Sequence, residues 1–85
     1  MNIMHLKYAV EINRTGSINS AAESLHVSQP NLSRAIKELE SSIGVSLFVR
    51  TSKGIITTVE GERFLRHARK ILKQIDEAKR RRFLQ

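Results

Sequence analysis

Two short stretches of helical periodicity, each beginning directly after a serine, constrain the fold of this chain more than any other feature. Ser17 and Ser28 suit the N-cap positions of two helices, and Pro30 suits the first turn of the second, where no N–H donor is needed. The apolar spacing predicts helices over about residues 18–25 and 29–42. Because only a few residues separate them, the two helices must lie close together.

A third helix is predicted at the start of the chain, over residues 3–14. Gly16 suits its left-handed C-terminal cap, and Gly44 suits the cap of the helix over residues 29–42. The expected buried stripe of the first helix consists of Ile3, Leu6, Ala9 and Val10.

Strand-forming side chains follow the helix predicted over residues 29–42. Residues 47–50 and 55–57 are rich in β-branched and aromatic side chains and enclose a turn with Gly54, which predicts a β-hairpin. A helix-turn-helix followed by such a hairpin is a winged helix-turn-helix. The predicted fold is mainly α, with three helices and a two-stranded hairpin wing, followed by a long linker or dimerisation helix.

The last helix is predicted from Val59 onward, capped by Thr57 or Thr58. Its apolar residues repeat in a heptad-like seam, which is typical of helix pairing. The seam could pack wholly within one subunit, but the helix is long for one small body to cover, which favours a homodimer. The seam predicted for dimerisation consists of Leu65, Ala68, Leu72 and Ile75, with a second row of Phe64, Ile71 and Ala78 beside it.

Charge and composition narrow the class of partner. The 85 residues carry a net charge of +7 and contain no Cys. A small basic domain points first to nucleic acid and second to an anionic membrane surface. However, +5 of this charge lies in residues 60–85, so DNA binding must be argued from placement. The absence of Cys excludes disulfides and fits a reducing, cytoplasmic location, and no apolar run is long enough to span a membrane.

The sequence offers little support for an enzyme. His5, His26 and His67 are scattered without the spacing of metal ligands, and no glycine-rich phosphate loop is present. We therefore expect no catalytic residues, no metal and no cofactor.

The side chains at the start of the 29–42 helix suit the reading of DNA bases. A helix-turn-helix places the N-terminal turns of its second helix in the major groove. Gln and Asn pair with adenine, Arg pairs with guanine, and Ser bonds either base. The candidate readers are Gln29, Asn31, Ser33 and Arg34.

Three stretches resemble the DNA-binding region of LysR-type transcriptional regulators. Residues 20–40 (SAAESLHVSQPNLSRAIKELE) resemble the family's helix-turn-helix, residues 43–51 (IGVSLFVRT) its passage into the wing, and residues 57–61 (TTVEG) its entry into the linker helix. Two core positions depart from the family pattern: Ala9 stands where a large aromatic is frequent, and Ile18 where Phe is common.

The resemblance implies a bacterial regulator that binds double-stranded DNA with interrupted dyad symmetry as a homodimer. It implies that the linker helices pair, and that a small-molecule effector is sensed by a domain absent from this chain. Gln29, Pro30, Ser33 and Arg34 would face the major groove, and Lys53 at the wing tip would enter the minor groove.

The predicted division is a winged helix-turn-helix over residues 1–58 and a linker helix over residues 59–85. Lys37 suits either DNA contact or a solvated face, and Arg50 suits either bracing of the hairpin or phosphate contact. The competing hypothesis is a protein-interaction module, a helical dimeriser whose basic surface serves solubility. The full set of predicted DNA-binding residues is Ser17, Ser28, Gln29, Pro30, Asn31, Ser33, Arg34, Lys37, Arg50 and Lys53.

Overall fold

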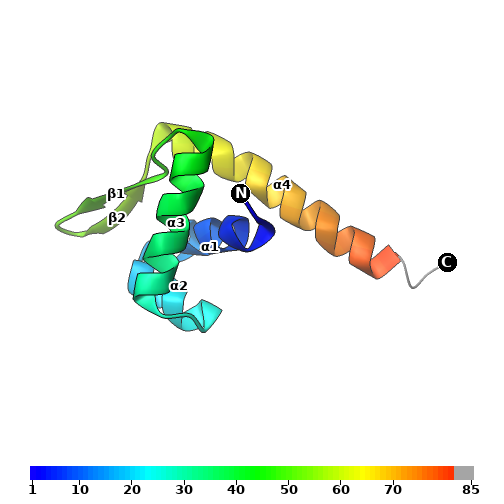
Figure 1. The fold of residues 1–85 in the computed structure, drawn as a ribbon, viewed down its shortest axis with the longest axis horizontal. Coiled ribbons are helices and arrows are strands. Elements are labelled where there is room, and N and C mark those ends of the chain that lie inside the picture. Colours follow the sequence, from blue (N-terminus) through cyan, green and yellow to red (C-terminus); the bar gives the residue numbers. More distant parts are fainter. Residues whose placement is uncertain (82–85) are drawn as a thin grey trace.

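The computed structural model describes residues 1–81 as four helices and one hairpin, with a long helix projecting from a small body (Figure 1). Among these residues, no helix is long and apolar enough to cross a membrane. The elements in chain order are α1 (Ile3–Thr15), α2 (Ile18–Leu25), α3 (Gln29–Ile43), β1 (Phe48–Thr51), β2 (Gly54–Thr57) and α4 (Val59–Arg81). The order confirms the predicted winged helix-turn-helix and long final helix.

Local capping explains where the first three helices begin and end. The Ser17 hydroxyl accepts a hydrogen bond from the Ser20 N–H at 3.1 Å, so Ser17 caps α2 as predicted. Ser28 caps α3 in the same way, with the Asn31 N–H at 3.2 Å. Gly16 adopts a φ of 71° at the end of α1, in the left-handed region that favours glycine.

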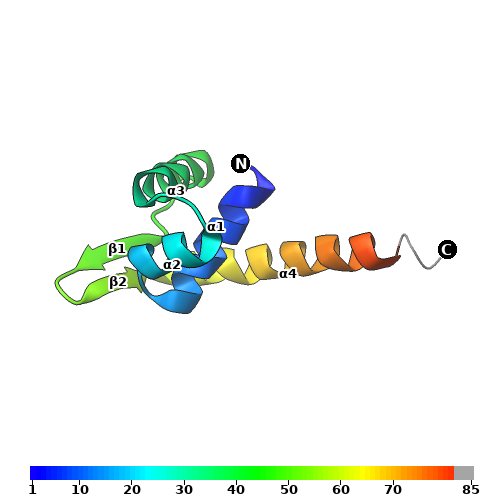
Figure 2. The ribbon, with the colours of Figure 1, turned by 90° about the horizontal axis from the view of Figure 1, so that it is seen from below.

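Helix α1 lies at the centre of the body and contacts α2, α3 and α4 (Figure 2). Its buried residues are Leu6, Ala9 and Ile12. The predicted stripe was therefore partly wrong, because Ile3 is 39% exposed and Ile12, which the stripe omitted, is fully buried. A helix packed by neighbours on more than one side buries a wider face than a single stripe.

The loop between α3 and β1 joins three elements through one residue, Leu47. The side chain of Leu47 is fully buried, and its N–H donates to the Glu40 carboxylate at 2.6 Å. Its carbonyl accepts from the Thr58 N–H at 2.9 Å, while the Thr58 hydroxyl donates to the Ser46 carbonyl at 2.6 Å. These bonds hold the end of α3, the start of the hairpin and the start of α4 together.

Gly61 allows α4 to approach this loop closely. A Cβ atom at Gly61 would lie 2.5 Å from the Leu47 carbonyl oxygen, which is too close for any side chain. The Thr58 hydroxyl also accepts from the Gly61 N–H at 2.8 Å, so Thr58, one of the two predicted caps, begins α4. Val59 follows as the first helical residue.

The hairpin pairs β1 and β2 in antiparallel register, with Val49 opposite Ile56 and Arg50 opposite Ile55. The first strand begins one residue later than predicted, because Leu47 is used by the core and its N–H bonds Glu40 rather than a strand. Strand alternation then places Val49 and Ile56 on the exposed face and turns Ile55 toward the body.

Helix α4 presents two different apolar rows. Gly61, Leu65 and Ala68 are buried against the body, and Leu72 packs beside them. The first half of the predicted seam therefore belongs to the core of its own chain. Phe64 of the second row also packs against the core, whereas Ile71, further along the helix, is 44% exposed. Figure 1 shows α4 leaving the body on the side away from the hairpin.

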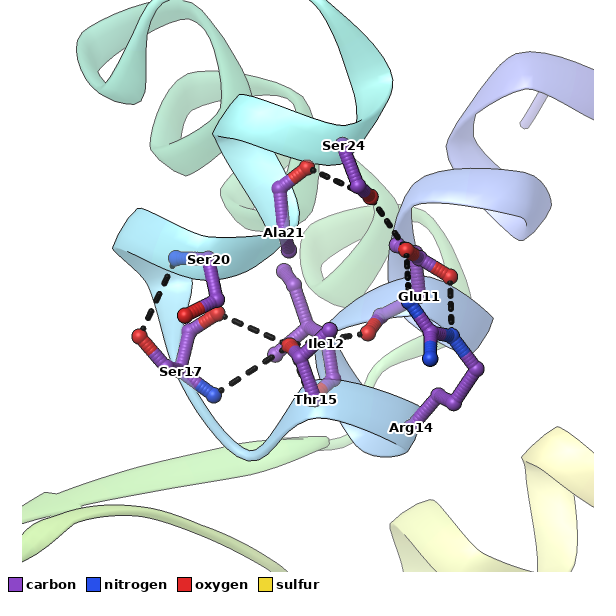
Figure 3. Close-up of polar contacts among 8 residues, drawn as sticks. All are labelled: Glu11, Ile12, Arg14, Thr15, Ser17, Ser20, Ala21 and Ser24. Atoms are coloured by element: carbon purple, nitrogen blue, oxygen red, sulfur yellow. Dashed lines mark hydrogen bonds and ion pairs between the residues drawn. The ribbon is translucent and has the colours of Figure 1, made fainter.

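A polar cluster ties α1 to α2 (Figure 3). The Arg14 guanidinium donates to both Glu11 carboxylate oxygens, at 2.8 and 2.6 Å, and the Ser24 hydroxyl donates to the same carboxylate. The Arg14 hydrogen bonds, followed by the Ser24 hydrogen bond, lower the pKa of Glu11 from an ordinary value of 4.5 to about 2. The charged form of Glu11 therefore stabilises the contact between the two helices.

Replacement of Gly61 tests the close contact with Leu47. We expect Gly61→Ala to lower the free energy of unfolding by about 1–3 kcal/mol, because the new Cβ would force α4 away from the loop. Urea denaturation followed by circular dichroism measures the change. The control is Gln74→Ala, at an exposed position of α4. A gain of about 1 kcal/mol in Gly61→Ala, the difference in helix propensity alone, would show that the contact is not tight.

The low pKa of Glu11 predicts a pH-dependent contribution to stability. Because the pKa is lowered in the folded state, the stabilisation is complete above about pH 4.5 and is lost as the pH falls toward about 2. We expect wild type to exceed Glu11→Gln in unfolding free energy by up to about 1 kcal/mol at pH 6 and by much less at pH 2.5. Denaturation at both pH values checks this, with Glu23→Gln on the exposed surface of α2 as the control. An equal difference at both pH values would contradict the assignment.

Candidate nucleic-acid interface

Helix α3 has one buried face and one exposed polar face. Leu32, Ala35, Ile36 and Leu39 pack into the core. The opposite face keeps several predicted DNA contacts in solvent. The exposed members are Gln29, Pro30, Asn31, Arg34 and Lys37, and Ser33 is half-buried beside them. The amphipathic pattern of α3 therefore turns the predicted reading residues outward together.

A shallow hollow of about 310 Å³ lies where α2, α3 and the hairpin meet. It brings together four predicted residues from three separate segments: Ser17, Gln29, Arg50 and Lys53. Its other lining residues are Gly16, Ile18, Asn19, Thr51, Gly54 and Ile55. Two cationic side chains and no acidic one line this hollow, so its chemistry suits an anion such as a backbone phosphate.

A second, smaller hollow of about 150 Å³ separates α3 from the hairpin. Ser33 and Lys37 line it from α3, and Arg50 lines it from β1. Arg50 thus borders both hollows. Its side chain makes no hydrogen bond to any of residues 1–81, which leaves the guanidinium free for a ligand.

One hydrogen bond links two of the exposed residues of α3. The Arg34 guanidinium donates to the Asn31 side-chain oxygen at 3.0 Å, one helical turn away. Ser28 lies at the N-terminus of the same helix as its cap. The predicted base readers are therefore arranged along the first turns of α3, at the positive end of the helix dipole, which also favours negative charge.

Lys53 lies in the turn at the tip of the hairpin and is exposed. Thr51 shapes this turn, since its hydroxyl donates to the Gly54 carbonyl at 3.1 Å and accepts from the Lys53 N–H at 3.2 Å. Gly54 has a φ of 130°, a conformation that side-chain-bearing residues rarely adopt. The turn holds the Lys53 side chain at the far end of the wing.

Two positioning residues were missed by the sequence analysis. Glu40 was given no role from the sequence, but its carboxylate accepts the N–H groups of Leu47 and Phe48 and fixes the hairpin against α3. Asn13 of α1 donates to the Thr57 hydroxyl at 2.9 Å and to the Glu62 carboxylate at 3.2 Å. The partners of Asn13 lie far along the chain, and those of Glu40 lie in the loop and strand that follow α3, so the apolar period of their own helices indicates neither role.

Within the described residues, no three His, Cys, Asp or Glu side chains lie close enough together to hold a metal ion. The arrangement instead presents an exposed polar helix and a cationic hairpin to one side of the molecule. This combination suits a grooved, negatively charged polymer.

Comparison with known proteins places the chain in a family. The family model described as "Bacterial regulatory helix-turn-helix protein, lysR family" matches residues 3–62. The transcriptional regulator TfdT of Cupriavidus pinatubonensis is 42% identical over 81 residues, which cover 95% of this chain and 36% of the relative. The Hca operon transcriptional activator HcaR of Escherichia coli is 43% identical and is covered to 27%. The chain thus spans about a quarter to a third of these relatives.

Solved structures agree with this assignment. The DNA-binding domain of CbnR in complex with DNA matches with a TM-score of 0.93 and 37% identity, covering 99% of this chain and 97% of that one. The DNA-binding domain of BenM with its catB site 1 DNA matches with a TM-score of 0.90 and 36% identity, with the same coverage. The chain belongs to the LysR family of bacterial regulatory helix-turn-helix proteins and is a DNA-binding domain of that family.

Proposed function

We propose that this chain binds double-stranded DNA sequence-specifically, with α3 in the major groove and the hairpin wing over the minor groove. One observation carries this proposal: the exposed polar face of α3 lies beside a hollow that collects Arg50 and Lys53. Base edges would meet the helix while phosphates meet the hollow. The CbnR and BenM domains, which share this fold, are described in complexes with DNA.

The proposed contacts divide into two groups. Gln29, Pro30, Asn31, Ser33 and Arg34 would face the bases, since they occupy the first turns of α3. The remaining residues would contact the DNA backbone or, from the wing, the minor groove. These are Ser17, Ser28, Lys37, Arg50 and Lys53. Phosphate contacts would position the domain, and base contacts would give it sequence preference.

The division of the chain at residues 58 and 59 is a proposal about folding units. Gly61 and Leu65 are buried in the body, so the first turns of α4 are part of the winged unit as well as of the linker. We propose that residues 59–85 form the linker helix. Because its first turns are buried in the body, we propose that this helix is rigidly joined to residues 1–58. Residues 82–85 lie outside the described residues.

We also propose a homodimer through α4. Leu65 and Ala68 are buried in the chain's own core and Leu72 packs against it, so the apolar side chains left for a partner are Ile75 of the seam and Ile71 of the second row. An exposed apolar side chain on a projecting helix is stabilised when a second copy covers it. A dimer of this kind would bind DNA with interrupted dyad symmetry.

The whole protein's regulation lies beyond this chain. Because the relatives are about two and a half to three and a half times as long as this chain, we assign the sensing of a small-molecule effector to a region outside the 85 residues. We propose a cytoplasmic location, where the DNA of a bacterium lies, with no membrane partner.

Competition binding tests the proposed function. Sequences selected from a random duplex pool are bound at physiological salt against unselected duplex of the same length. We expect the selected duplex to bind at least roughly a thousandfold more tightly. Equal binding of both duplexes would contradict sequence-specific recognition and favour the alternative of a basic helical dimeriser.

Lys53→Ala tests the role of the wing. We expect a uniform loss of affinity across sequences and a decrease of about 1 in the slope of log affinity against log salt, because one cation leaves the DNA backbone. Titrations at several salt concentrations measure both quantities. Lys70→Ala on α4 is the charge-matched control, and an equal change in both variants would remove the wing from the interface.

Ile71→Glu tests the dimer. A carboxylate at this position would be buried on pairing, so we expect sedimentation equilibrium to shift toward the monomer. Lys70→Glu places the same group one residue away, on another face of the helix, and is expected to leave the equilibrium nearly unchanged. A dimer that persists in Ile71→Glu would show that this row is not the interface.

A further inference from the structure

We infer that Asn31 and Arg34 act as one hydrogen-bonding unit that presents mainly donors to the DNA bases, so that this turn of α3 prefers guanine to adenine. The inference rests on the proposed function, because it requires α3 to face base edges. The inference concerns base preference, which the fold alone does not determine. Its basis is the hydrogen bond from the Arg34 guanidinium to the Asn31 side chain.

The chemistry of the pair fixes the orientation of the Asn31 amide. A guanidinium has five N–H donors and no acceptor, so only the amide oxygen of Asn31 can face it. The contact, Arg34 Nη1 to Asn31 Oδ1 at 3.0 Å, has this orientation. The amide NH₂ group is therefore directed away from Arg34, and it makes no hydrogen bond within residues 1–81.

This orientation conflicts with the usual way in which asparagine reads adenine. That pairing needs Oδ1 to accept from the adenine N6 amino group while Nδ2 donates to N7. Here one lone pair of Oδ1 already accepts from a cation, and an N6 amino group brought to the second lone pair would lie beside the Arg34 N–H donors and their positive charge. Donor against donor is repulsive, so adenine is disfavoured at this place. Asn31 is thereby changed from an adenine reader into part of an arginine site.

The same geometry favours guanine. Guanine presents two acceptors, O6 and N7, in the major groove, and arginine bonds both. One N–H of Arg34 is used by Asn31, which leaves enough donors for a bidentate pair. The Asn31 NH₂ group adds a further donor beside them, which an acceptor on the neighbouring base pair, such as guanine O6 or thymine O4, would satisfy.

Asn31 also holds Arg34 in place before DNA arrives. Both side chains are exposed, and a free arginine loses much rotamer freedom when it binds. A side chain already restrained by a neighbour loses less, which strengthens its contact with the base. Asn31 is thus a positioning residue for Arg34 in addition to offering its own donors.

The test compares base preferences among four proteins: wild type, Asn31→Ala, Arg34→Ala and the double variant. Each is used to select duplexes from a random pool, and affinities are then measured on duplexes with guanine or adenine at the position that Arg34→Ala affects. We expect wild type to prefer guanine there by roughly tenfold or more, and Arg34→Ala to lose the preference. We expect Asn31→Ala to lower the same preference by roughly threefold or more, non-additively in the double variant.

Asn31→Asp separates positioning from reading. Aspartate keeps the oxygen acceptor for Arg34 but lacks the NH₂ donors, so guanine preference at the Arg34 position should persist while the preference at the neighbouring base pair is lost. Gln74→Ala on α4 is the control and should leave every preference unchanged. Circular dichroism confirms that each variant is folded, which is expected because both side chains are exposed.

Two results would overturn the inference. The first is an adenine preference in wild type that Asn31→Ala alone removes, because it would make Asn31 an independent adenine reader. The second is strictly additive effects of Asn31→Ala and Arg34→Ala on a folded protein that still prefers selected DNA. A wild-type protein that binds selected and random duplex equally would instead overturn the proposed function, so the two failures are distinguishable.

Discussion

The hydrogen bonds made by the backbone N–H and carbonyl of Leu47 are the constraint on which the geometry of this domain depends. A buried side chain draws the loop inward, and a backbone group taken from water must find partners inside the protein. The Leu47 N–H finds the Glu40 carboxylate of α3, and its carbonyl finds the N–H of Thr58 at the start of α4. Since the hairpin begins at the next residue, the wing cannot tilt without breaking one of these bonds. The hollows beside α3 therefore have a defined shape before any ligand binds.

The sequence predicted those features that depend on neighbours along the chain. Helix ends followed from Ser17, Ser28 and Gly16, because a cap acts within one turn of its own position. The hairpin followed from β-forming residues on either side of a turn with Gly54. The outward face of α3 followed from its apolar period, so the predicted readers were correctly expected to share one exposed surface.

Interactions between distant segments were not predictable in the same way. Asn13 bonds Thr57 and Glu62, and nothing near Asn13 in the sequence marks these partners. The partner of the apolar seam of α4 was also not predictable from neighbours along the chain. Burial against α1 and burial against a second copy require the same helical spacing, so Leu65 and Ala68 could not be assigned until the packing was known. Only the tertiary structure distinguishes a core position from an interface position.

The two apolar rows of α4 differ in what they pack against: one is buried in the body of its own chain, and the other is the row that we propose for the dimer. One row, from Gly61 through Leu65 and Ala68, packs the helix against the body, whereas Ile71 in the adjacent row is exposed and is the position that we propose for contact with a second copy. Both rows lie on one continuous helix that begins at the Leu47 loop, with no break between them. If two copies pair through Ile71, the distance and angle between their α3 helices follow from the geometry of that pairing. The spacing of the two DNA half-sites would then be set by the pairing of the two α4 helices, while the Leu47 loop holds each wing beside its own α3.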